Sequence, residues 1–341
     1  MPAGSTDAKF LLRSSRAKPR DDAGFRCALG GWFRKNGRDL PWRRTRDPYA
    51  VLVSEIMLQQ TQVGAVISYY NEWLRRFPTV GALARASEGQ VLRAWQGLGY
   101  YSRARNLHRC AKIALRRFSG KLPRDPTQLR LLPGIGHYTA NAIAVFAFDR
   151  SLPLVEANTA RVLARLFNIR ERIDSNAGRR RLWEASGQLV PKSRPREFHS
   201  ALMDLGAVVC RARNPRCDIC PVKQFCAAPD PCALPVKRRR PPAVALEESH
   251  ALITRASTVL LAQCRTRWRG MWTLPSIVPT KNKPIYVSSF RFTHHQVTLQ
   301  VFRGRLRRLN PGERWFSHTQ LRMIPMPSPH RRALESLLAQ S

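Results

Sequence analysis

The fold is decided by one short stretch, Leu132-Pro133-Gly134-Ile135-Gly136-His137-Tyr138-Thr139. Its glycines permit backbone conformations and close approaches that other residues cannot adopt, and the stretch joins two segments with helical periodicity. Backbone N–H groups at the start of the second helix can hold a phosphate group. A glycine pair of this kind often marks only a tight turn. Here we expect Gly134, Gly136 and Thr139 to contact the backbone of a nucleic acid.

The sequence around this stretch divides into regions of different composition. From about residue 23 to 230, apolar residues recur at helical spacing, and this region is predicted to be mainly α. It follows a basic arm over 1–22, which we expect to be disordered. A proline-rich basic linker is predicted over 231–247. Short alternating stretches then predict a small α+β domain over 248–341.

The charge of the chain indicates its partner. Lysine and arginine total 59 against 22 aspartate and glutamate residues, which gives a formal net charge of +37. A surface of this kind attracts a polyanion, and nucleic acid is the expected one. No apolar run reaches the length of a membrane span. We therefore expect a DNA-binding protein that has no membrane segment and is cytoplasmic.

Four cysteines form the strongest chemical motif. Cys210, Cys217, Cys220 and Cys226 are separated by six, two and five residues in a basic segment. Four thiolates at this density can surround one metal centre. Zinc is the alternative, because a four-cysteine site does not by itself name its metal. The spacing resembles the iron–sulfur loop of the endonuclease III superfamily, so a 4Fe-4S cluster is expected.

Glu55 is the candidate general acid. Helical spacing places it on the same face as Val51, Leu52 and Leu58. A carboxyl group in apolar surroundings is costly to ionise, so we expect a raised pKa and a proton held near neutral pH. By itself, a glutamate on an apolar stripe is more often a helix-edge residue or an ion-pair partner. The sequence on either side of Glu55 decides between these interpretations.

Several motifs together resemble the MutY family of adenine DNA glycosylases. They are 40–43, 54–62, 97–107, the glycine stretch and the cysteine loop, and they cover most of 23–230. The resemblance implies a helix-hairpin-helix DNA glycosylase with an iron–sulfur loop. It also implies a double-stranded DNA partner that contains an adenine mispaired with 8-oxoguanine or guanine. We further expect a monomer associated with the bacterial nucleoid.

The resemblance assigns roles to individual residues. Glu55 would protonate adenine, Tyr138 would stand where the family has serine or tyrosine, and Asn158 would support the catalytic carboxylate. Gln60 and Tyr100 would wedge into the DNA stack, and Trp42 and Arg43 would line the pocket for the extruded adenine. Bifunctional relatives carry a lysine where this chain has Tyr138. We therefore expect base removal without efficient strand cleavage.

The second carboxylate departs from the family pattern. The usual Asp-Gly-Asn is replaced by Glu156-Ala157-Asn158. A carboxylate about 4 Å from a developing sugar cation contributes on the order of 4 kcal/mol at an effective dielectric constant of about 20. Glutamate keeps that charge, but its extra methylene moves the charge by roughly an ångström, which can cost about a hundredfold in rate. The alternative is a catalytically silent module that only binds the lesion.

The C-terminal region resembles the Nudix-like domain of the same family through 259–263 and 268–275. It lacks the glutamate-rich helix that holds Mg²⁺ in pyrophosphate hydrolases. Phe292-Thr293-His294 resembles the family's Phe-Ser-His element, which implies that Thr293 and His294 contact 8-oxoguanine. Ser200 stands where relatives commonly have glutamine or glutamate. This difference leaves a second enzymatic activity as an alternative, namely the removal of mismatched thymine.

Overall fold

The computed structural model describes residues 21–239, 241–279 and 282–339. The chain forms two compact units, one made of the residues up to Arg38 together with 151–237 and the other of 39–150 together with 238–341. The predicted helical region therefore contributes to both units, because the chain leaves the first unit after α1 (Asp22–Asn36) and returns to it after α8 (His137–Phe148). Sequence periodicity, which is local, could not reveal this exchange.

The predicted domain boundaries need two corrections. Most of the basic arm expected over 1–22 lies outside the described residues, but its last two residues begin α1. Asp21 caps this helix by accepting a hydrogen bond from the Gly24 backbone N–H over 2.8 Å. The strand β1 (Val244–Leu252) starts inside the linker expected over 231–247. Its first residues pair with β6 (His295–Arg303), and this pairing extends the strand beyond its apolar part.

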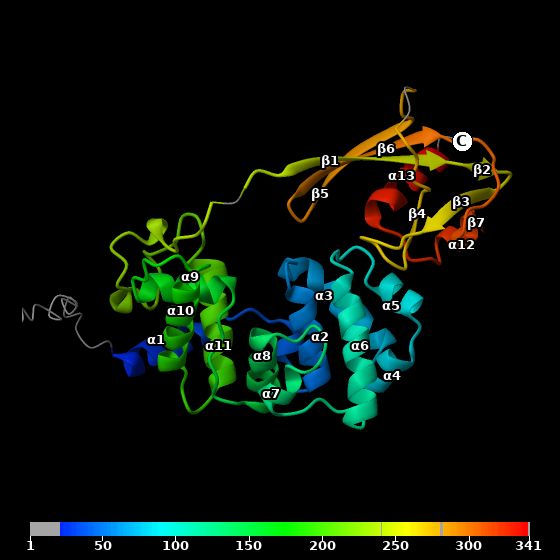
Figure 1. Cartoon of the computed structure of the whole chain (residues 1–341). Helices are drawn as coiled ribbons and strands as arrows, with labels where there is room; N and C mark the ends of the chain where they lie inside the picture. The colour runs from blue at the N-terminus through cyan, green and yellow to red at the C-terminus, as the bar shows by residue number, and fades with distance from the viewer. Residues whose placement is uncertain (1–20, 240, 280–281, 340–341) are drawn as a thin grey trace, which may run out of the picture. The chain divides into compact units, whose positions relative to one another are not determined.

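The helices of the second unit surround one buried helix. They are η1 (Pro41–Arg43), α2 (Pro48–Leu58), α3 (Val63–Arg76), α4 (Val80–Arg85), α5 (Glu88–Ala94), α6 (Ser102–Arg117), α7 (Pro126–Leu129) and α8. Every residue of α2 from Tyr49 to Met57 is buried. A helix that is apolar on all sides must be enclosed, and α2 contacts α3, α6 and α8 (Figure 1).

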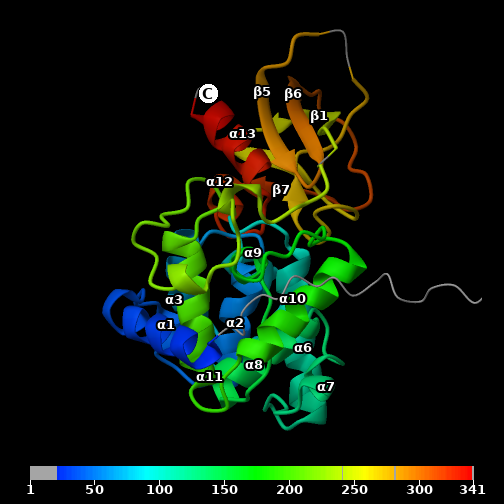
Figure 2. The same ribbon diagram turned by 90° about the vertical axis from the view of Figure 1, so that its left-hand side faces the viewer.

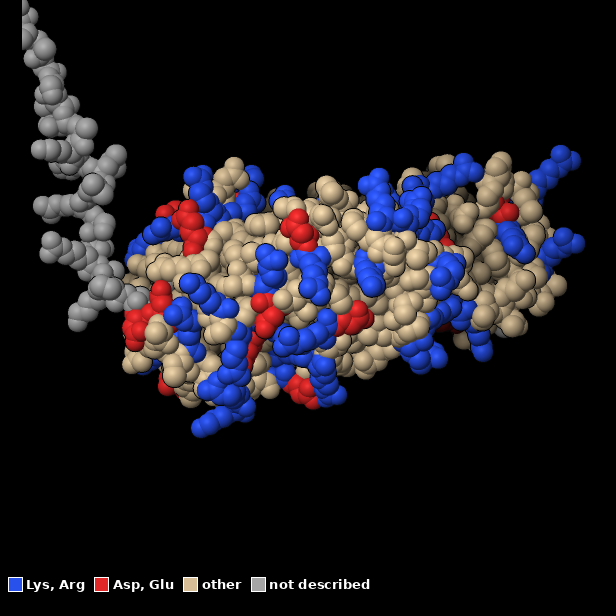
Figure 3. All heavy atoms as spheres, turned by 90° about the horizontal axis from the view of Figure 1, so that it is seen from below, with Lys and Arg blue, Asp and Glu red and all other residues tan. Residues whose placement is uncertain are grey.

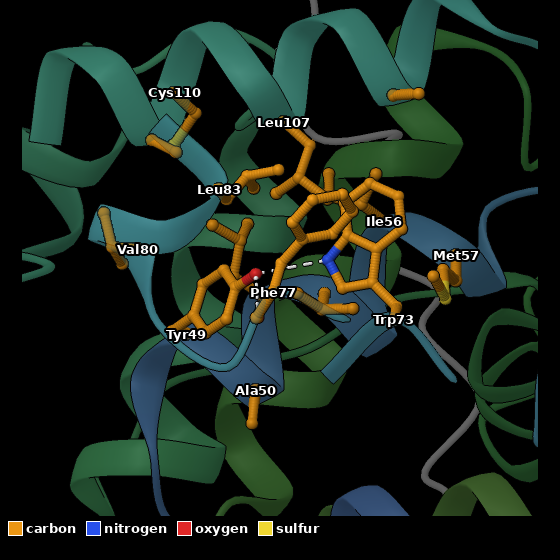
Figure 4. Close-up of a cluster of buried hydrophobic side chains, with 14 of the residues drawn as sticks. Tyr49, Ala50, Ile56, Met57, Trp73, Phe77, Val80, Leu83, Leu107 and Cys110 are labelled. Carbon is orange, nitrogen blue, oxygen red and sulfur yellow. Dashed lines mark hydrogen bonds between the residues drawn. The ribbon is translucent and has the colours of Figure 1, made fainter. Parts of the chain in front are cut away.

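The core beside α2 combines apolar packing with a small polar network. The Tyr49 hydroxyl donates to the Phe77 carbonyl over 2.9 Å and accepts from the Trp73 indole N–H over 3.2 Å (Figure 4). Burial raises the pKa of Tyr49 above its usual value, so the hydroxyl stays protonated and can donate. This network fixes the start of α2 against α3 and the residue that follows it.

The first unit is also helical. It contains α1, α9 (Ala157–Leu166), α10 (Asn176–Leu189), α11 (Pro195–Asp204), a π-helical turn η2 (Leu205–Val209) and the short 3-10 helices η3 (Lys223–Phe225) and η4 (Pro231–Ala233). Phe25 and Leu29 of α1 are fully buried in a core shared with α9, α10 and α11. Among the described helices of both units, none is both long and apolar enough to cross a membrane.

The C-terminal part of the second unit is the predicted small α+β domain. Its strands are β1, β2 (Thr254–Arg255), β3 (Thr258–Gln263), β4 (Trp272–Thr273), β5 (Tyr286–Phe292), β6 and β7 (Glu313–Ser317). One sheet has the order β1-β6-β5, with β1 parallel to β6, and in the other β3 pairs with β2, β4 and β7. The helix α12 (His318–Leu321) follows β7, and α13 (Ser328–Leu338) packs on β5 (Figure 2).

Contacts join this domain to the helices of its own unit. Trp268 and Met271 are buried in the same apolar cluster as Leu92 and Leu107. The Arg105 guanidinium donates to the Arg269 carbonyl over 2.9 Å. These contacts tie the loop before β4 to α5 and α6.

Candidate functional site

Glu55 lies in the middle of the enclosed helix α2. Only 8% of its surface is exposed. The neighbouring Ser54 hydroxyl donates to the Val51 carbonyl over 2.8 Å, so that side chain is satisfied within the helix. A carboxyl group that has lost most of its water is costly to keep ionised. Glu55 thus lies in the enclosed part of α2 as expected, and its role as a proton donor stays a prediction.

Glu156 is the N-cap of α9. Its two carboxylate oxygens accept hydrogen bonds from the backbone N–H groups of Asn158 and Thr159, over 2.7 and 2.8 Å. The Thr159 hydroxyl accepts from the Glu156 backbone N–H over 2.7 Å and completes a capping box. Burial raises the pKa of Glu156, although both backbone hydrogen bonds favour its ionised form. The side chain thus has a fixed direction despite its extra methylene.

Asn158 and Arg161 link Glu156 to the cysteine loop through α9. The Arg161 guanidinium donates to the Asn158 side-chain oxygen over 2.8 Å, to the Gly206 carbonyl over 2.6 Å and to the Cys210 carbonyl over 2.8 Å. A side chain at Gly206 would clash with Asn158, because an added Cβ would lie 2.8 Å from the Asn158 Cβ. The predicted supporting residue is therefore held between a buried arginine and the π-helical turn.

The cysteine loop begins directly after that turn. Arg165 donates from one nitrogen to the Cys210 Sγ over 3.2 Å and to the Arg211 carbonyl over 2.8 Å. Burial raises the pKa of Cys220 to about 11, and the other three cysteines add to the increase. The start of the loop is thus attached to α9 through Arg165. Sequence reasoning missed Arg161 and Arg165, whose only signal was a charge within the apolar periodicity of α9.

The four cysteines of the loop are the residues that could hold a metal centre. Among the described residues, no group of three or more His, Cys, Asp or Glu side chains is gathered closely enough to hold a metal ion. The choice between zinc and a 4Fe-4S cluster therefore rests on the spacing of the cysteines in the sequence. When bound, the cluster would be held by Cys210, Cys217, Cys220 and Cys226.

The glycine stretch forms the predicted turn between α7 and α8. Gly134 has a φ of 82°, and a Cβ added there would lie 2.8 Å from the Asn106 Cβ. Gly136 is the N-cap of α8 and offers no side-chain cap. Tyr138, in the first turn of α8, is half-buried. The helix-hairpin-helix unit is therefore present, with a glycine required at position 134 by both conformation and space.

The side chain of Thr139 points inward. It is 3% exposed, and its hydroxyl accepts a hydrogen bond from the Gln59 amide over 3.5 Å. The side chain therefore joins α8 to the end of α2, and the contact of Thr139 with a nucleic-acid backbone, through its own backbone N–H, stays a prediction. Position within the turn could not distinguish an inward residue from an outward one.

The two predicted wedge residues share an unusual backbone. Gln60 and Tyr100 have φ values of 57° and 47°, in the left-handed region that glycine favours. Both are exposed, Tyr100 to 39%. The predicted pocket residues lie nearby in sequence, in η1. Trp42 is buried with its ring edge against Tyr70 at 5.5 Å between centroids, and Arg43 is half-buried.

Thr293 and His294 form the turn between β5 and β6. Both are exposed, and Thr293 has a φ of 53°. Behind them the Arg267 guanidinium stacks on Trp268 and Phe292, at 4.4 and 4.7 Å from the ring centroids. Ser200, by contrast, is buried on α11. The turn thus exposes two polar residues beside a cluster of Arg267, Trp268 and Phe292.

Basic side chains are numerous on the face of the molecule that Figure 3 shows. Figure 3 shows lysine and arginine spread over the visible face, with smaller groups of aspartate and glutamate between them. This distribution is typical of a protein that tracks a phosphate backbone. Together with the helix-hairpin-helix unit, the buried glutamate and the cysteine loop, it defines a DNA repair protein of the helix-hairpin-helix class.

Comparison with known proteins identifies the family. Residues 53–188 match the model of the HhH-GPD superfamily of base excision DNA repair proteins, and 210–226 match the iron–sulfur binding domain of endonuclease III. The chain is 30% identical to a thermostable thymine-DNA glycosylase, covering 60% of this chain and 95% of that one with a TM-score of 0.56. The chain belongs to the HhH-GPD superfamily.

The curated relatives are adenine DNA glycosylases. The human enzyme is 45% identical over 213 residues, which cover 60% of this chain and 39% of the human protein. The enzyme of Mycolicibacterium smegmatis is 45% identical over 195 residues, covering 57% of this chain and 66% of that protein. The chain thus spans about two fifths of the human relative. These matches confirm the predicted resemblance and the iron–sulfur cluster.

Loss of a ligand should remove the cluster. Replacing Cys217 with serine should leave the purified protein with little iron and without the broad visible absorption of a thiolate-bound cluster. The measurement is iron and sulfide content per chain, together with the absorption spectrum. The control is Cys232→Ser, because Cys232 is exposed and outside the loop. Stoichiometric zinc with no iron in the unmodified protein would contradict the assignment.

Proposed function

We propose that the chain is a monofunctional DNA glycosylase that hydrolyses the N-glycosidic bond of adenine mispaired with 8-oxoguanine or guanine. The observation that carries the proposal is the buried Glu55 on α2, inside the segment that matches the base excision repair family. The adenine specificity of the curated relatives supports the choice of base. The expected monomer and its place at the nucleoid of a bacterial cell stay predictions.

The chemistry assigns different protonation states to two carboxyl groups. Adenine leaves readily only when it is protonated, and Glu55 supplies that proton as a general acid. As the bond to the sugar breaks, positive charge develops on the sugar, and the ionised Glu156 stabilises it. Glu55 belongs to the second unit and Glu156 to the first. The two backbone hydrogen bonds of Glu156 favour its ionised form and partly offset the burial that raises its pKa.

Several elements bind and open the duplex in this proposal. The turn at Gly134 and Gly136 holds a phosphate through the first turn of α8. Gln60 and Tyr100 enter the base stack while the target adenine rotates out of it. Trp42 and Arg43 then line the adenine pocket. Because Tyr138 replaces the lysine that forms a Schiff base, the abasic product stays uncleaved.

One excision assay distinguishes the proposed function from two others. Removal of mismatched thymine is favoured by the 30% identity to a thymine-DNA glycosylase. A silent lesion-binding module is favoured by the departure at Glu156. Single-turnover excision on A·8-oxoguanine, A·G, A·C and T·G duplexes separates all three, with alkali treatment to distinguish base loss from strand scission.

One prediction of the proposed function concerns the proton donor. Glu55→Gln should bind A·8-oxoguanine duplex nearly as well as the unmodified protein, because shape and burial are kept. Its single-turnover excision should fall at least a hundredfold, because the amide does not supply the proton. Glu72→Gln is the control, since Glu72 is an exposed glutamate on α3. Equal rates for the unmodified protein and Glu55→Gln would remove Glu55 from the mechanism.

The second prediction concerns the charge at position 156. Glu156→Gln should lower excision about a thousandfold, which corresponds to about 4 kcal/mol of lost electrostatic stabilisation, while Glu156→Asp should keep measurable activity. Since burial raises the pKa of Glu156 and the ionised form is required, excision should decline on acidification at a higher pH than an ordinary glutamate would give.

The control for position 156 is Glu171→Gln, which changes an exposed glutamate of the same unit. One result would favour the silent module. In that case the unmodified protein would show no excision on any mispair, and Glu156→Asp would restore it.

The third prediction concerns lesion reading by the turn between β5 and β6. Replacing Thr293 and His294 together with alanine should reduce the preference for A·8-oxoguanine over A·G about tenfold, because exposed polar groups that contact only the lesion would be lost. Excision on A·G should remain largely intact. The measurement is the ratio of single-turnover rates on the two duplexes. An equal loss on both would make the turn structural.

A further inference from the structure

Arg103 is a charged side chain buried in the first turn of α6. Only 8% of its surface is exposed. One terminal nitrogen donates to the carbonyls of Ile56 and Met57, each over 2.9 Å, and to that of Gln59. The other donates to the Thr61 hydroxyl over 3.1 Å and to the carbonyls of Leu98 and Gly99 over 3.0 and 3.2 Å. A single guanidinium therefore connects two segments that lie about forty positions apart in the sequence.

The segments that Arg103 holds are the ones that carry the wedge residues. Gln60 lies between two of its partners, Gln59 and Thr61, and Tyr100 directly follows a third, Gly99. Both wedge residues have positive φ. A residue other than glycine keeps such a conformation only where its surroundings enforce it. The hydrogen bonds of Arg103 to the flanking backbone supply that enforcement in both loops.

Arg103 also donates hydrogen bonds to the last turn of α2, the helix that carries Glu55. The last carbonyls of an α-helix have no partner within the helix, and Ile56 and Met57 belong to the last turn of α2. A cation at this end is favoured by the helix dipole. Glu55 immediately precedes Ile56 in the chain. The position of the proton donor along α2 is therefore tied to the same guanidinium as the two wedge loops.

The charge of Arg103 is retained in this environment. Its partners in the described part of the chain are six neutral oxygens, together with the ring faces of Trp95 and Tyr100 at 5.2 and 5.6 Å. Burial lowers the pKa of Arg103 to about 10, so the group stays charged at neutral pH. A planar fork with two terminal nitrogens can serve two sets of acceptors at once, whereas the single nitrogen of lysine cannot.

We propose that Arg103 is a positioning residue that locks the two wedge loops, 59–61 and 98–100, and the end of α2 into one rigid body. Opening of the base stack and delivery of the extruded base to Glu55 are then coupled through it. The inference rests on the proposed function for the roles of Gln60, Tyr100 and Glu55. The mechanical part, a shared anchor for two loops, can be tested without any substrate.

The first test is hydrogen–deuterium exchange in the intact chain without DNA. Arg103→Lys should raise amide exchange at least about tenfold in both 58–62 and 97–101, because lysine cannot hold both loops. The matched control is Arg109→Lys, an exposed arginine on the same helix, which should leave both loops unchanged. Unchanged exchange in Arg103→Lys, or a change confined to one loop, would overturn the proposal.

A second variant serves if Arg103→Lys does not fold. Thr61→Val removes one acceptor of Arg103 in the first loop and keeps the shape of the side chain. Since the same guanidinium serves both loops, exchange should also rise in 97–101, although the substitution lies elsewhere. An effect restricted to 58–62 would contradict the shared anchor.

The functional test uses duplexes with 2-aminopurine as the extruded base and with adenine for excision. Arg103→Lys should reduce both the fluorescence increase and the single-turnover rate at least tenfold, and adding Gln60→Ala should cost much less than it does in the unmodified background. Additive losses would mean that Arg103 does not act through the wedge. Absence of excision in the unmodified protein would instead refute the proposed function, and the exchange experiment would still decide the anchor.

Discussion

Enclosure of α2 is the constraint on which the rest of the structure depends. Its residues from Tyr49 to Met57 are all buried, so helices must cover every side, and α3, α6 and α8 do so. An enclosed helix imposes a cost on any polar group that it carries. Glu55 lies on this helix with 8% of its surface exposed, so the enclosure of α2 also surrounds its carboxyl group. In the proposed function, the packing that stabilises the fold also creates the environment of the proton donor.

Buried arginines stabilise the irregular backbone near the candidate sites. Carbonyl groups at helix ends and in turns need donors when water is excluded. Arg103 supplies them to the two wedge loops, Arg161 to the π-helical turn and Arg165 to the start of the cysteine loop. A guanidinium suits this task because its donors form a rigid fork. These irregular segments are therefore held by donors from the protein interior.

Local signals allowed much of the site to be predicted. The cysteine spacing, the glycine turn and the apolar surroundings of Glu55 each act over a few residues. The cysteine segment matches an iron–sulfur binding domain, the glycine stretch forms a turn before α8, and Glu55 is buried on α2. Three features depend on contacts between distant segments and could not be predicted this way. They are the division of the helical region between two units, the inward side chain of Thr139 and the start of β1 inside the expected linker. Arg103 was hidden for another reason. In a chain with 59 basic residues, nothing in the sequence distinguishes one buried arginine from those on the surface.

Glu156 shows how a departure from the family pattern can be accommodated. Aspartate is a preferred N-cap and glutamate is not, yet Glu156 reaches two backbone N–H groups and receives a capping box through Thr159. An ionised carboxylate has about four acceptor sites, so two hydrogen bonds leave capacity for a cation. The helix start adds its own partial positive charge and favours the ionised form. A longer side chain here keeps a defined direction because the helix that it caps holds it in place. The cap geometry therefore fixes the direction of the longer side chain, and its two backbone hydrogen bonds act against the burial that raises its pKa.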